Sequence, residues 1–339
     1  MANLIRGCAV SDLPIGIVGT GVYLPERVLT NADLEKLVDT SDQWIRERTG
    51  IRERRVAGPD EDVATMGVAA ARQALVNAGI PWDQLRYIVA ASNTSNYMYP
   101  AIAIRIQHGL GLDDKLAAFD LQAGCSGFNY ALYVAENLIK HEGGYALVIG
   151  TDTNTRMLDF ADRSTCILFG DGAGAVVIGP TDRSRLLASF LASAYNGKLY
   201  LKTEFSELNS PFLPKPTPVN HYMYMDGPEI FKFAVRAVQE SLRRILAQAH
   251  MTREEIDFLI IHQANYRILE TGARFAKVPM DKVYVNVDRY GNTSAASIPI
   301  ALHEALMEGK IKKNHKVILI SFGAGVTWAA TALEWLGGS

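Results

Sequence analysis

FDLQAGCSGFNYALYVAENLI, residues Phe119–Ile139, has a counterpart of equal length in VDRYGNTSAASIPIALHEALM, residues Val287–Met307. Each stretch has the pattern of a strand end, then a glycine, then a helix entered through small residues. When the two stretches are aligned on Gly124 and Gly291, which takes a shift of one residue, Cys125 falls on Asn292, and each of them follows a glycine. All α/β chains look somewhat self-similar, but a glycine and a polar residue at the same helix entry favour a duplicated unit.

The repeat extends to the stretches that precede these two. Ala70–Ser92 and Gln239–Gln263 both have the pattern of a helix, a turn, a short acidic segment and a strand. Each half then continues into a further apolar strand. The sequence therefore predicts two similar halves, residues 1–185 and 186–339, with the boundary around Pro180–Asp182.

Apolar, β-branched runs alternate with helical patterns, which favours a layered α/β fold. Ala64–Ala78 and Val235–Ala249 have apolar residues at helical spacing. GDGAG, residues 170–174, predicts a tight turn, and Ser206–His221, with four prolines, predicts a loop. The expected strands are Ile15–Val18, Tyr87–Ala91, Ala146–Ile149, Ala175–Ile178, Phe258–Ile261, Val283–Val287 and Val317–Ile320.

Composition narrows the functional classes. The 339 residues are 48% hydrophobic and carry a net charge of −2, so no basic field favours nucleic acid as a partner. No stretch reaches the ~18 apolar residues that a membrane helix needs, and the first residues lack a signal-peptide pattern. The three cysteines, Cys8, Cys125 and Cys166, have unrelated spacings that fit a reducing compartment. We expect a cytoplasmic protein without a membrane partner, and no motif predicts a metal.

Cys125 is the first candidate for chemistry. It lies in AGCSGF, where small neighbours allow close approach of a substrate, and an amphipathic helical pattern follows it. A thiol at a helix N-terminus has a lowered pKa, which predicts a thiolate nucleophile. The alternative is a small buried hydrophobe, the usual role of a free cysteine. Cys8 lies in an N-terminal segment expected to fray, and Cys166 lies in an apolar strand start, so neither is favoured.

Three further features lie close to Cys125 under the repeat. His262 ends the strand Phe258–Ile261, where α/β folds place chemistry, although a structural histidine is also possible. Asn292 is related to Cys125 by the pseudo-symmetry, although it could simply cap a helix. Gly323-Ala324-Gly325 could present backbone N–H groups as an oxyanion hole, or form an ordinary turn.

From about Gly16 to Leu336, the chain resembles the β-ketoacyl-acyl-carrier-protein synthase III family of the thiolase-like superfamily. The resemblance implies an α/β thiolase-like fold, with two βαβαβαββ halves stacked in five αβαβα layers. The motifs that carry it are TSDQWIRERTGIRERR (40–55), AGCSGFNYA (123–131), DRSTCILFGDGAGAVVI (162–178), HQANYRI (262–268), RYGNTSAASIPIAL (289–302) and SFGAGVTW (321–328).

The resemblance also implies the activity. It is a ping-pong, decarboxylative condensation of a short acyl-CoA, with acetyl-CoA expected, and malonyl-acyl carrier protein, and it starts type II fatty-acid synthesis. A homodimer is implied, and no cofactor is implied beyond the two thioester substrates. The alternative that stays open is a specialised member that transfers an acyl group to another acceptor.

Site residues carried over from the family fall into five groups. They are the triad Cys125, His262 and Asn292; the oxyanion N–H groups of Cys125 and Ala324; coenzyme A positions Thr40, Trp44, Arg48, Arg163, Gly227 and Asn265, with Trp44 and Arg163 around the adenine; acyl-pocket positions Tyr99, Asn154, Phe169 and Phe322, with Tyr99 reaching across the dimer; and carrier-protein positions Lys232, Arg267 and Arg274.

Some positions depart from the family pattern, and four other classes of protein fit the sequence less well. Ala324 replaces a common glycine, and Asn154 replaces an apolar residue of some members, while the segment 195–224 is long and proline-rich. A biosynthetic thiolase would need Cys166 as a second catalytic cysteine. A hydroxymethylglutaryl-CoA synthase would need a glutamate base, and a plant-type polyketide synthase would have a GFGPG-type loop. A non-catalytic partner subunit would lack the nucleophile, which this chain keeps.

Overall fold

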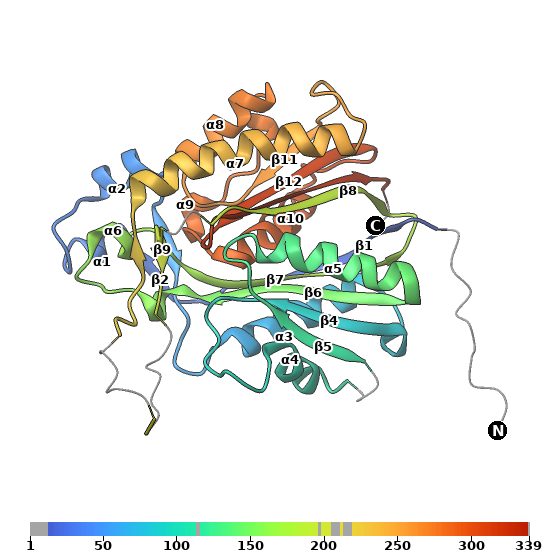
Figure 1. Cartoon of the computed structure of the whole chain (residues 1–339), viewed down its shortest axis with the longest axis horizontal. Helices are drawn as coiled ribbons and strands as arrows, with labels where there is room; N and C mark the ends of the chain where they lie inside the picture. Colours follow the sequence, from blue (N-terminus) through green and yellow to red (C-terminus); the bar gives the residue numbers. More distant parts are fainter. Residues whose placement is uncertain (1–12, 113–115, 196–197, 205–210, 213–218, 338–339) are drawn as a thin grey trace.

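Two β-sheets alternate with three layers of helices in the computed structural model (Figure 1). It describes residues 13–112, 116–195, 198–204, 211–212 and 219–337. One helix layer covers the outer face of each sheet, and a third layer lies between the sheets. The predicted α/β fold with five alternating layers is therefore confirmed.

The first sheet has five strands, in which β4 runs parallel to both β5 and β6, while β7 runs antiparallel to β1 and β6. Strand β5 lies at one edge of this sheet. In spatial order the strands are β1 (Ile15–Tyr23), β7 (Asp171–Pro180), β6 (Tyr145–Thr153), β4 (Leu85–Ala91) and β5 (Ala117–Leu121).

The second sheet repeats this order with four strands. The sequence β8-β13-β12-β11 corresponds to β1-β7-β6-β4, and an isolated parallel bridge between Leu259 and Val283 lies where β5 would follow. The shared order supports the duplication, while the exact boundary at residue 185 stays a prediction. The strands are β8 (Ser184–Ser193), β13 (Thr327–Trp335), β12 (His315–Gly323) and β11 (Phe258–Ile261).

Among the described residues, the three helix layers are built from the longer helices of the chain (Figure 1). Within the described part of the chain, no helix has the length and apolarity to cross a bilayer. The helices are α3 (Val63–Ala78) and α4 (Ile102–Leu110) outside the first sheet, α5 (Gly127–Glu142) and α10 (Ser297–Met307) between the sheets, and α7 (Gly227–Gln248) and α8 (Tyr266–Ala276) outside the second.

Strand periodicity explains why each sheet is buried on both faces. In β11, Leu259 and Ile261 face the outer core under α7 and α8, while Phe258 and Ile260 face the core between the sheets. Successive side chains of a strand point to opposite faces, so a continuous apolar run is what a doubly covered strand requires. This pattern made the central strands visible in the sequence.

Shorter elements connect the layers. Helix α2 ends at Gly50, which adopts φ of 79°, and β2 and β3 form a small antiparallel ribbon. The short elements are β2 (Val28–Thr30), α1 (Asn31–Leu34), α2 (Asp42–Thr49), β3 (Glu53–Arg55), α6 (Arg163–Cys166), β9 (Leu201–Lys202), β10 (Tyr224–Met225), α9 (Val287–Tyr290) and the 3₁₀ turns Trp82–Gln84, Asn154–Met157, Met280–Lys282 and Ser294–Ala296.

Several local predictions were wrong. The expected turn at residues 170–174 is the start of β7, because Gly174 packs against Pro299 of the buried helix α10, where a side chain would not fit. The expected strand Val283–Val287 is reduced to the bridge at Val283, since the chain turns into α9 at Val287. Cys166 ends the short helix α6 and does not start a strand.

Two further predictions concern the part of the chain between β8 and β11. The predicted loop Ser206–His221 lies mostly outside the described residues, as does Cys8. Next to that loop, β9 and β10 pair with each other in antiparallel fashion. The predicted helix Val235–Ala249 is α7, which begins earlier, at Gly227, where Asp226 caps its first turn by accepting from the backbone N–H of Glu229.

Candidate active site

Cys125 lies two residues before α5, as the sequence predicts. Its side chain is only 6% exposed. Gly124 precedes it with φ of 56°, a conformation that favours glycine, and a Cβ there would lie 2.6 Å from the backbone N and O of Ala324. A Cβ on Gly323 would overlap the backbone N of Cys125. Two glycines therefore allow the backbones of the two halves to meet at the thiol.

The expected lowering of the Cys125 pKa is wrong for this structure. Burial raises the pKa of the thiol to about 11, and the nearby Asp152 carboxylate adds to the rise. The Ser294 hydroxyl and the backbone N–H groups of Ala324 and Cys125 act in the opposite direction by hydrogen bonding to the sulfur. The side chain therefore rests as a thiol, and its proton must be removed before attack.

His262 follows β11 and is 1% exposed. Burial lowers the pKa of its imidazole to about 3, so the ring is neutral near pH 7. Its Nδ1 lies 2.7 Å from the hydroxyl of Ser297, which already accepts from the backbone N–H of Gln263 at 3.0 Å. We infer from these bonds that Ser297 donates to Nδ1 and that Nε2 carries the ring proton. Phe322 packs edge-on against the ring at 5.2 Å.

Asn292 is held by hydrogen bonds from both its backbone N–H and its backbone carbonyl. Its backbone N–H donates to the carbonyl of Leu168 at 2.8 Å, and its carbonyl accepts from Gly170 at 3.0 Å. Its side-chain oxygen accepts from the backbone N–H of Ser294 at 2.8 Å. Since the oxygen is engaged, the amide NH₂ is left as the donating end of the side chain.

One small cavity, of about 160 Å³, brings the three candidate triad residues together. Mostly apolar side chains line it, so a charge that develops inside interacts strongly with the few polar groups present. Of the predicted site residues, its walls contain Cys125, His262, Asn292, Gly227, Asn265, Phe169 and Phe322.

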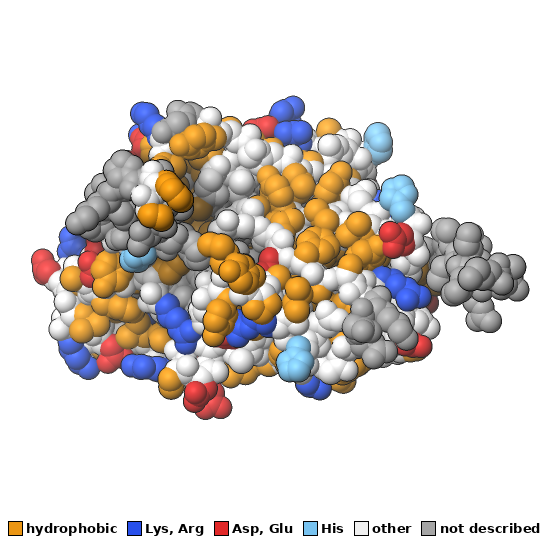
Figure 2. Space-filling model, turned by 60° about the horizontal axis from the view of Figure 1, so that its bottom comes forward, with side chains coloured by type: hydrophobic (Ala, Val, Ile, Leu, Met, Phe, Trp, Pro, Cys, Tyr) orange, Lys and Arg blue, Asp and Glu red, His pale blue; other side chains and the backbone are white. Residues whose placement is uncertain are grey.

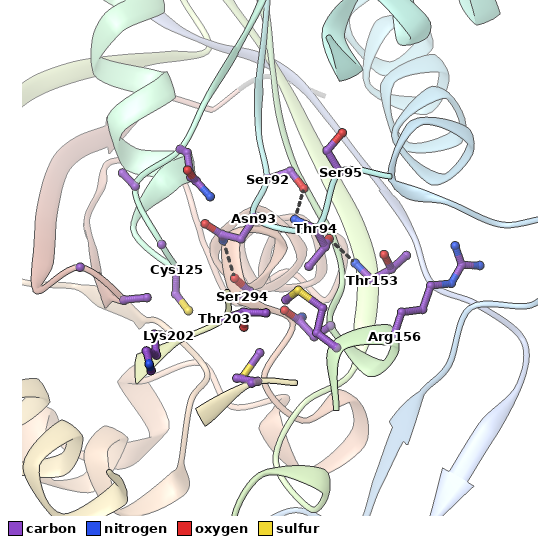
Figure 3. A pocket seen from close by; sticks show the side chains of 18 of the residues that line it. Ser92, Asn93, Thr94, Ser95, Cys125, Thr153, Arg156, Lys202, Thr203 and Ser294 are labelled. Atoms are coloured by element: carbon purple, nitrogen blue, oxygen red, sulfur yellow. Dashed lines mark hydrogen bonds between the residues drawn. The ribbon is translucent and has the colours of Figure 1, made fainter. Parts of the chain in front are cut away.

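A larger hollow, of about 980 Å³, also borders Cys125 (Figure 3). Its walls include Asn154, Phe169, Ser294 and Ala324. Asn154 does not point freely into it, because its amide donates to the carbonyl of Gly170 at 2.8 Å. Cys125 thus lies between a narrow apolar cavity and a wider, more polar hollow.

The predicted coenzyme A positions lie on or near α2, α6, α7 and α8. The guanidinium of Arg163 lies 4.7 Å from the centre of the Trp44 ring, and that of Arg48 lies 5.7 Å from it. Arg163 thus stacks directly on Trp44, so a base inserted between them would displace the guanidinium. The hydroxyl of Thr40 is buried without a hydrogen-bond partner, and the amide of Asn265 donates to the carbonyl of Arg48 at 3.1 Å.

The remaining predicted residues lie on the surface. Tyr99 is 80% exposed and is absent from the walls of both cavities. Lys232 pairs with Glu229 at 2.7 Å in an exposed contact on α7. Arg267 donates to the carbonyl of Glu47 at 3.0 Å, while Arg274 is exposed in the last turn of α8. The structure does not bring these four residues to Cys125.

Sequence reasoning missed a buried acid beside the thiol. Asp152 is fully buried at the end of β6, and Ser297 and Ser294 are buried next to the triad. The signal was available, since Asp152 interrupts the apolar run YALVIGTDT (145–153) at a strand end. A single aspartate without an obvious partner in the sequence does not by itself predict a catalytic role.

The fold and this junction of two halves define the class: the chain is a thiolase-like condensing enzyme, and thus an acyltransferase. Residues 119–194 match the family described as 3-oxoacyl-[acyl-carrier-protein (ACP)] synthase III, and residues 246–335 match its C-terminal part. The β-ketoacyl-[acyl-carrier-protein] synthase III of Symbiobacterium thermophilum is 45% identical over 95% of this chain and 98% of its own length.

Solved structures agree. The 3-oxoacyl-[acyl-carrier-protein] synthase III of Aquifex aeolicus VF5 has a TM-score of 0.87 and 43% identity, covering 95% of this chain and all of its own. The priming β-ketosynthase of the R1128 polyketide biosynthetic pathway has a TM-score of 0.87 and 34% identity, covering 98% and 100%. The chain belongs to the β-ketoacyl-[acyl-carrier-protein] synthase III family.

Proposed function

We propose that the chain condenses a short acyl-CoA, acetyl-CoA in the first instance, with malonyl-acyl carrier protein. The observation that carries the proposal is the position of Cys125, His262 and Asn292 around one apolar cavity of about 160 Å³. The nucleophile and both hydrogen-bond donors can then reach one bound thioester.

In the first half-reaction, Cys125 attacks the thioester carbonyl of acyl-CoA and coenzyme A leaves. The backbone N–H groups of Cys125 and Ala324 both reach the sulfur, so they are placed to bind the oxyanion formed next to it. Ala324 keeps this N–H although it replaces a common glycine. The product is an acyl-enzyme.

In the second half-reaction, malonyl-acyl carrier protein loses its carboxylate and forms an enolate. The amide NH₂ of Asn292 and the Nε2–H of His262 donate hydrogen bonds to the enolate oxygen. The low pKa of His262 suits this role, because the imidazole stays a neutral donor. The carbanion then attacks the acyl group on Cys125, which gives the β-ketoacyl product.

We propose that coenzyme A enters past Trp44 and Arg163 and reaches the thiol along Gly227 and Asn265. Gly227 supports this path, since a Cβ there would meet only the end of Met225, at 3.8 Å. The partnerless Thr40 hydroxyl fits a polar contact with coenzyme A. Lys232, Arg267 and Arg274 form the surface proposed for the acidic carrier protein.

We propose a homodimer in which Tyr99 of a second copy closes the hollow beside Cys125. Edge strand β5 has a free side in the single chain, and Tyr97, Met98 and Tyr99 are 54%, 72% and 80% exposed. Apolar side chains also gather in patches on the face drawn in Figure 2. Exposed apolar patches next to an open sheet edge are typical of a protein–protein interface.

Intact-mass spectrometry tests the proposal. The chain is incubated with acetyl-, isobutyryl-, hexanoyl- and decanoyl-CoA in turn, and malonyl-acyl carrier protein is then added. We expect one acyl group on Cys125 from the short thioesters, and its transfer to give a β-ketoacyl-carrier protein. Acylation without any transfer to malonyl-acyl carrier protein would favour the alternative, a member that serves another acceptor.

A further inference from the structure

We propose that Ser294 and Asp152 form a proton relay that takes the proton of the Cys125 thiol, so Asp152 is the general base of the first half-reaction. The proposal rests on Cys125 being the nucleophile of the proposed function. Ser294 lines the larger hollow beside Cys125, whereas His262 and Asn292 line the small cavity, and Figure 3 shows the Cys125 sulfur beside Ser294.

The hydrogen bonds of Ser294 give the relay a direction. Its side chain lines the larger hollow with Cys125, the next residue, Ala295, donates to Asp152, and the hydroxyl interacts with both the sulfur and the carboxylate, lowering the pKa of each. Its oxygen also accepts from the side-chain NH₂ of Asn93 at 3.1 Å. A hydroxyl has one proton to donate, and the carboxylate can only accept. The proton of Ser294 therefore goes to Asp152, and the thiol of Cys125 donates to the oxygen of Ser294.

Asp152 is built to carry a charge in a buried place. Its oxygens accept from the backbone N–H groups of Asn93 at 2.7 Å and Ala295 at 3.0 Å. They also accept from the hydroxyls of Ser92 at 3.0 Å and Thr94 at 2.9 Å. Burial nevertheless raises the pKa of this carboxyl, which makes it a better proton acceptor than an exposed aspartate.

His262 is poorly suited to accept the thiol proton. Burial lowers the pKa of its ring to about 3, and its Nε2 already carries the proton in the tautomer inferred above. Asp152 is the carboxylate that raises the pKa of Cys125. A thiolate beside an ionised Asp152 would place two negative charges in one buried site, whereas the relay moves one charge from carboxylate to sulfur.

The step balances. The S–H bond of Cys125 breaks as its proton passes to the oxygen of Ser294, and the Ser294 proton passes to Asp152. The sulfur forms a bond to the thioester carbon, and the carbon–sulfur bond to coenzyme A breaks. The proton held on Asp152 then neutralises the departing thiolate, so the products are acyl-Cys125 and the thiol of coenzyme A.

Single-turnover acylation by acetyl-CoA tests the relay, with Ser294→Ala compared to Ser92→Ala. Both variants remove a hydroxyl that binds Asp152, but only Ser294 touches the sulfur. We expect Ser294→Ala to slow acylation at pH 7 by on the order of 10²-fold. Its rate should rise about tenfold per pH unit up to the thiol pKa of about 11. Ser92→Ala should have an effect at least about tenfold smaller. Equal effects of the two variants would overturn the relay.

The Asp152→Asn variant distinguishes a general base from a carboxylate that acts only through its charge. The two roles predict opposite changes in the rate at which Cys125 is alkylated. If Asp152 acted only through its charge, its removal would stabilise the thiolate and speed alkylation of Cys125 by iodoacetamide at pH 7. The relay predicts slower alkylation and slower acylation. Faster alkylation would overturn it. If Asp152→Asn does not fold, as circular dichroism would show, the serine pair still decides.

Alkylation by iodoacetamide also tests the relay independently of the proposed function, because it needs no acyl-CoA. If the unaltered chain accepts no acyl group from any acyl-CoA, the proposed function fails. The pH profile of alkylation in the Ser294→Ala and Ser92→Ala variants still measures the transfer of the thiol proton.

Discussion

The two sides of Cys125 offer opposite kinds of polar group. On the side of the small cavity, which we term the donor side, His262 and Asn292 present N–H groups. On the side of the larger hollow, the acceptor side, Ser294 presents its hydroxyl oxygen, and this hydroxyl connects the thiol to the buried carboxylate of Asp152. Donors stabilise negative charge on a substrate oxygen, while acceptors remove a proton. The difference suggests that binding of the enolate oxygen and deprotonation of the thiol are assigned to different walls of one site.

The largest effect should come from removing the sulfur between the two sides. Cys125→Ala should abolish labelling by radioactive acetyl-CoA, because neither side contains another nucleophile in the proposed mechanism. Cys166→Ala is the matched control, since Cys166 is also a buried free cysteine but lies in α6. Stoichiometric labelling of the Cys125→Ala variant would refute the assignment of the nucleophile.

The donor side is tested next by Asn292→Ala. Self-acylation by acetyl-CoA should stay close to that of the unaltered chain, while condensation with malonyl-carrier protein should fall by ~10²-fold, as for other oxyanion donors. Rapid-quench kinetics of the two half-reactions measure the separation. A parallel loss of both rates would mean that Asn292 does not distinguish the enolate step from acyl transfer.

The neutral state of His262 has a consequence for stability. Burial lowers its pKa to about 3 in the folded chain, against about 6.5 in the unfolded chain. Between these values the unfolded chain binds more protons, so the free energy of unfolding falls as pH falls from 6.5 towards 3. Between pH 7 and pH 5, His262 should account for about 2 kcal/mol of that fall.

Denaturant unfolding of the His262→Asn variant at pH 7 and pH 5 checks this value. The variant should lose about 2 kcal/mol less than the unaltered chain over that interval. Burial also lowers the pKa of His303, which therefore contributes equally in both proteins and cancels in the comparison. An identical pH dependence in both proteins would show that folding does not lower the pKa of His262.

The smallest effect should come from Ser297, which acts on the donor side through His262. Ser297→Ala removes the hydroxyl that fixes the ring tautomer, and we expect condensation to slow by about tenfold. Ser297→Thr keeps a hydroxyl and should restore most of the rate. Self-acylation serves as the second readout, because a merely structural defect would depress both half-reactions.

The sequence was informative where a local pattern records burial. Continuous apolar runs predicted β4, β6 and β11, and helical spacing with a terminal glycine predicted α3. The repeat predicted that Cys125 and Asn292 would meet, and both line the same cavity. Each of these features depends on periodicity or on the pairing of similar segments, which a single chain displays directly.

Other features depend on contacts between distant segments. The helix N-terminus alone suggested a low pKa for Cys125, but burial and Asp152 reverse the direction. The glycines of residues 170–174 resemble a turn, yet they allow β7 to pack closely on α10. In both cases the deciding neighbour lies far away in the sequence, so no local pattern could reveal it.

The close contact of Gly124 with Ala324 has a kinetic consequence. The surroundings of the sulfur come from segments about 200 residues apart, so they exist only after both sheets have formed and docked. During refolding, circular dichroism should therefore recover before the thiol becomes protected from alkylation. Mild denaturant that loosens only this contact should abolish acyl transfer while most secondary structure persists. Catalytic competence is thus acquired last and lost first.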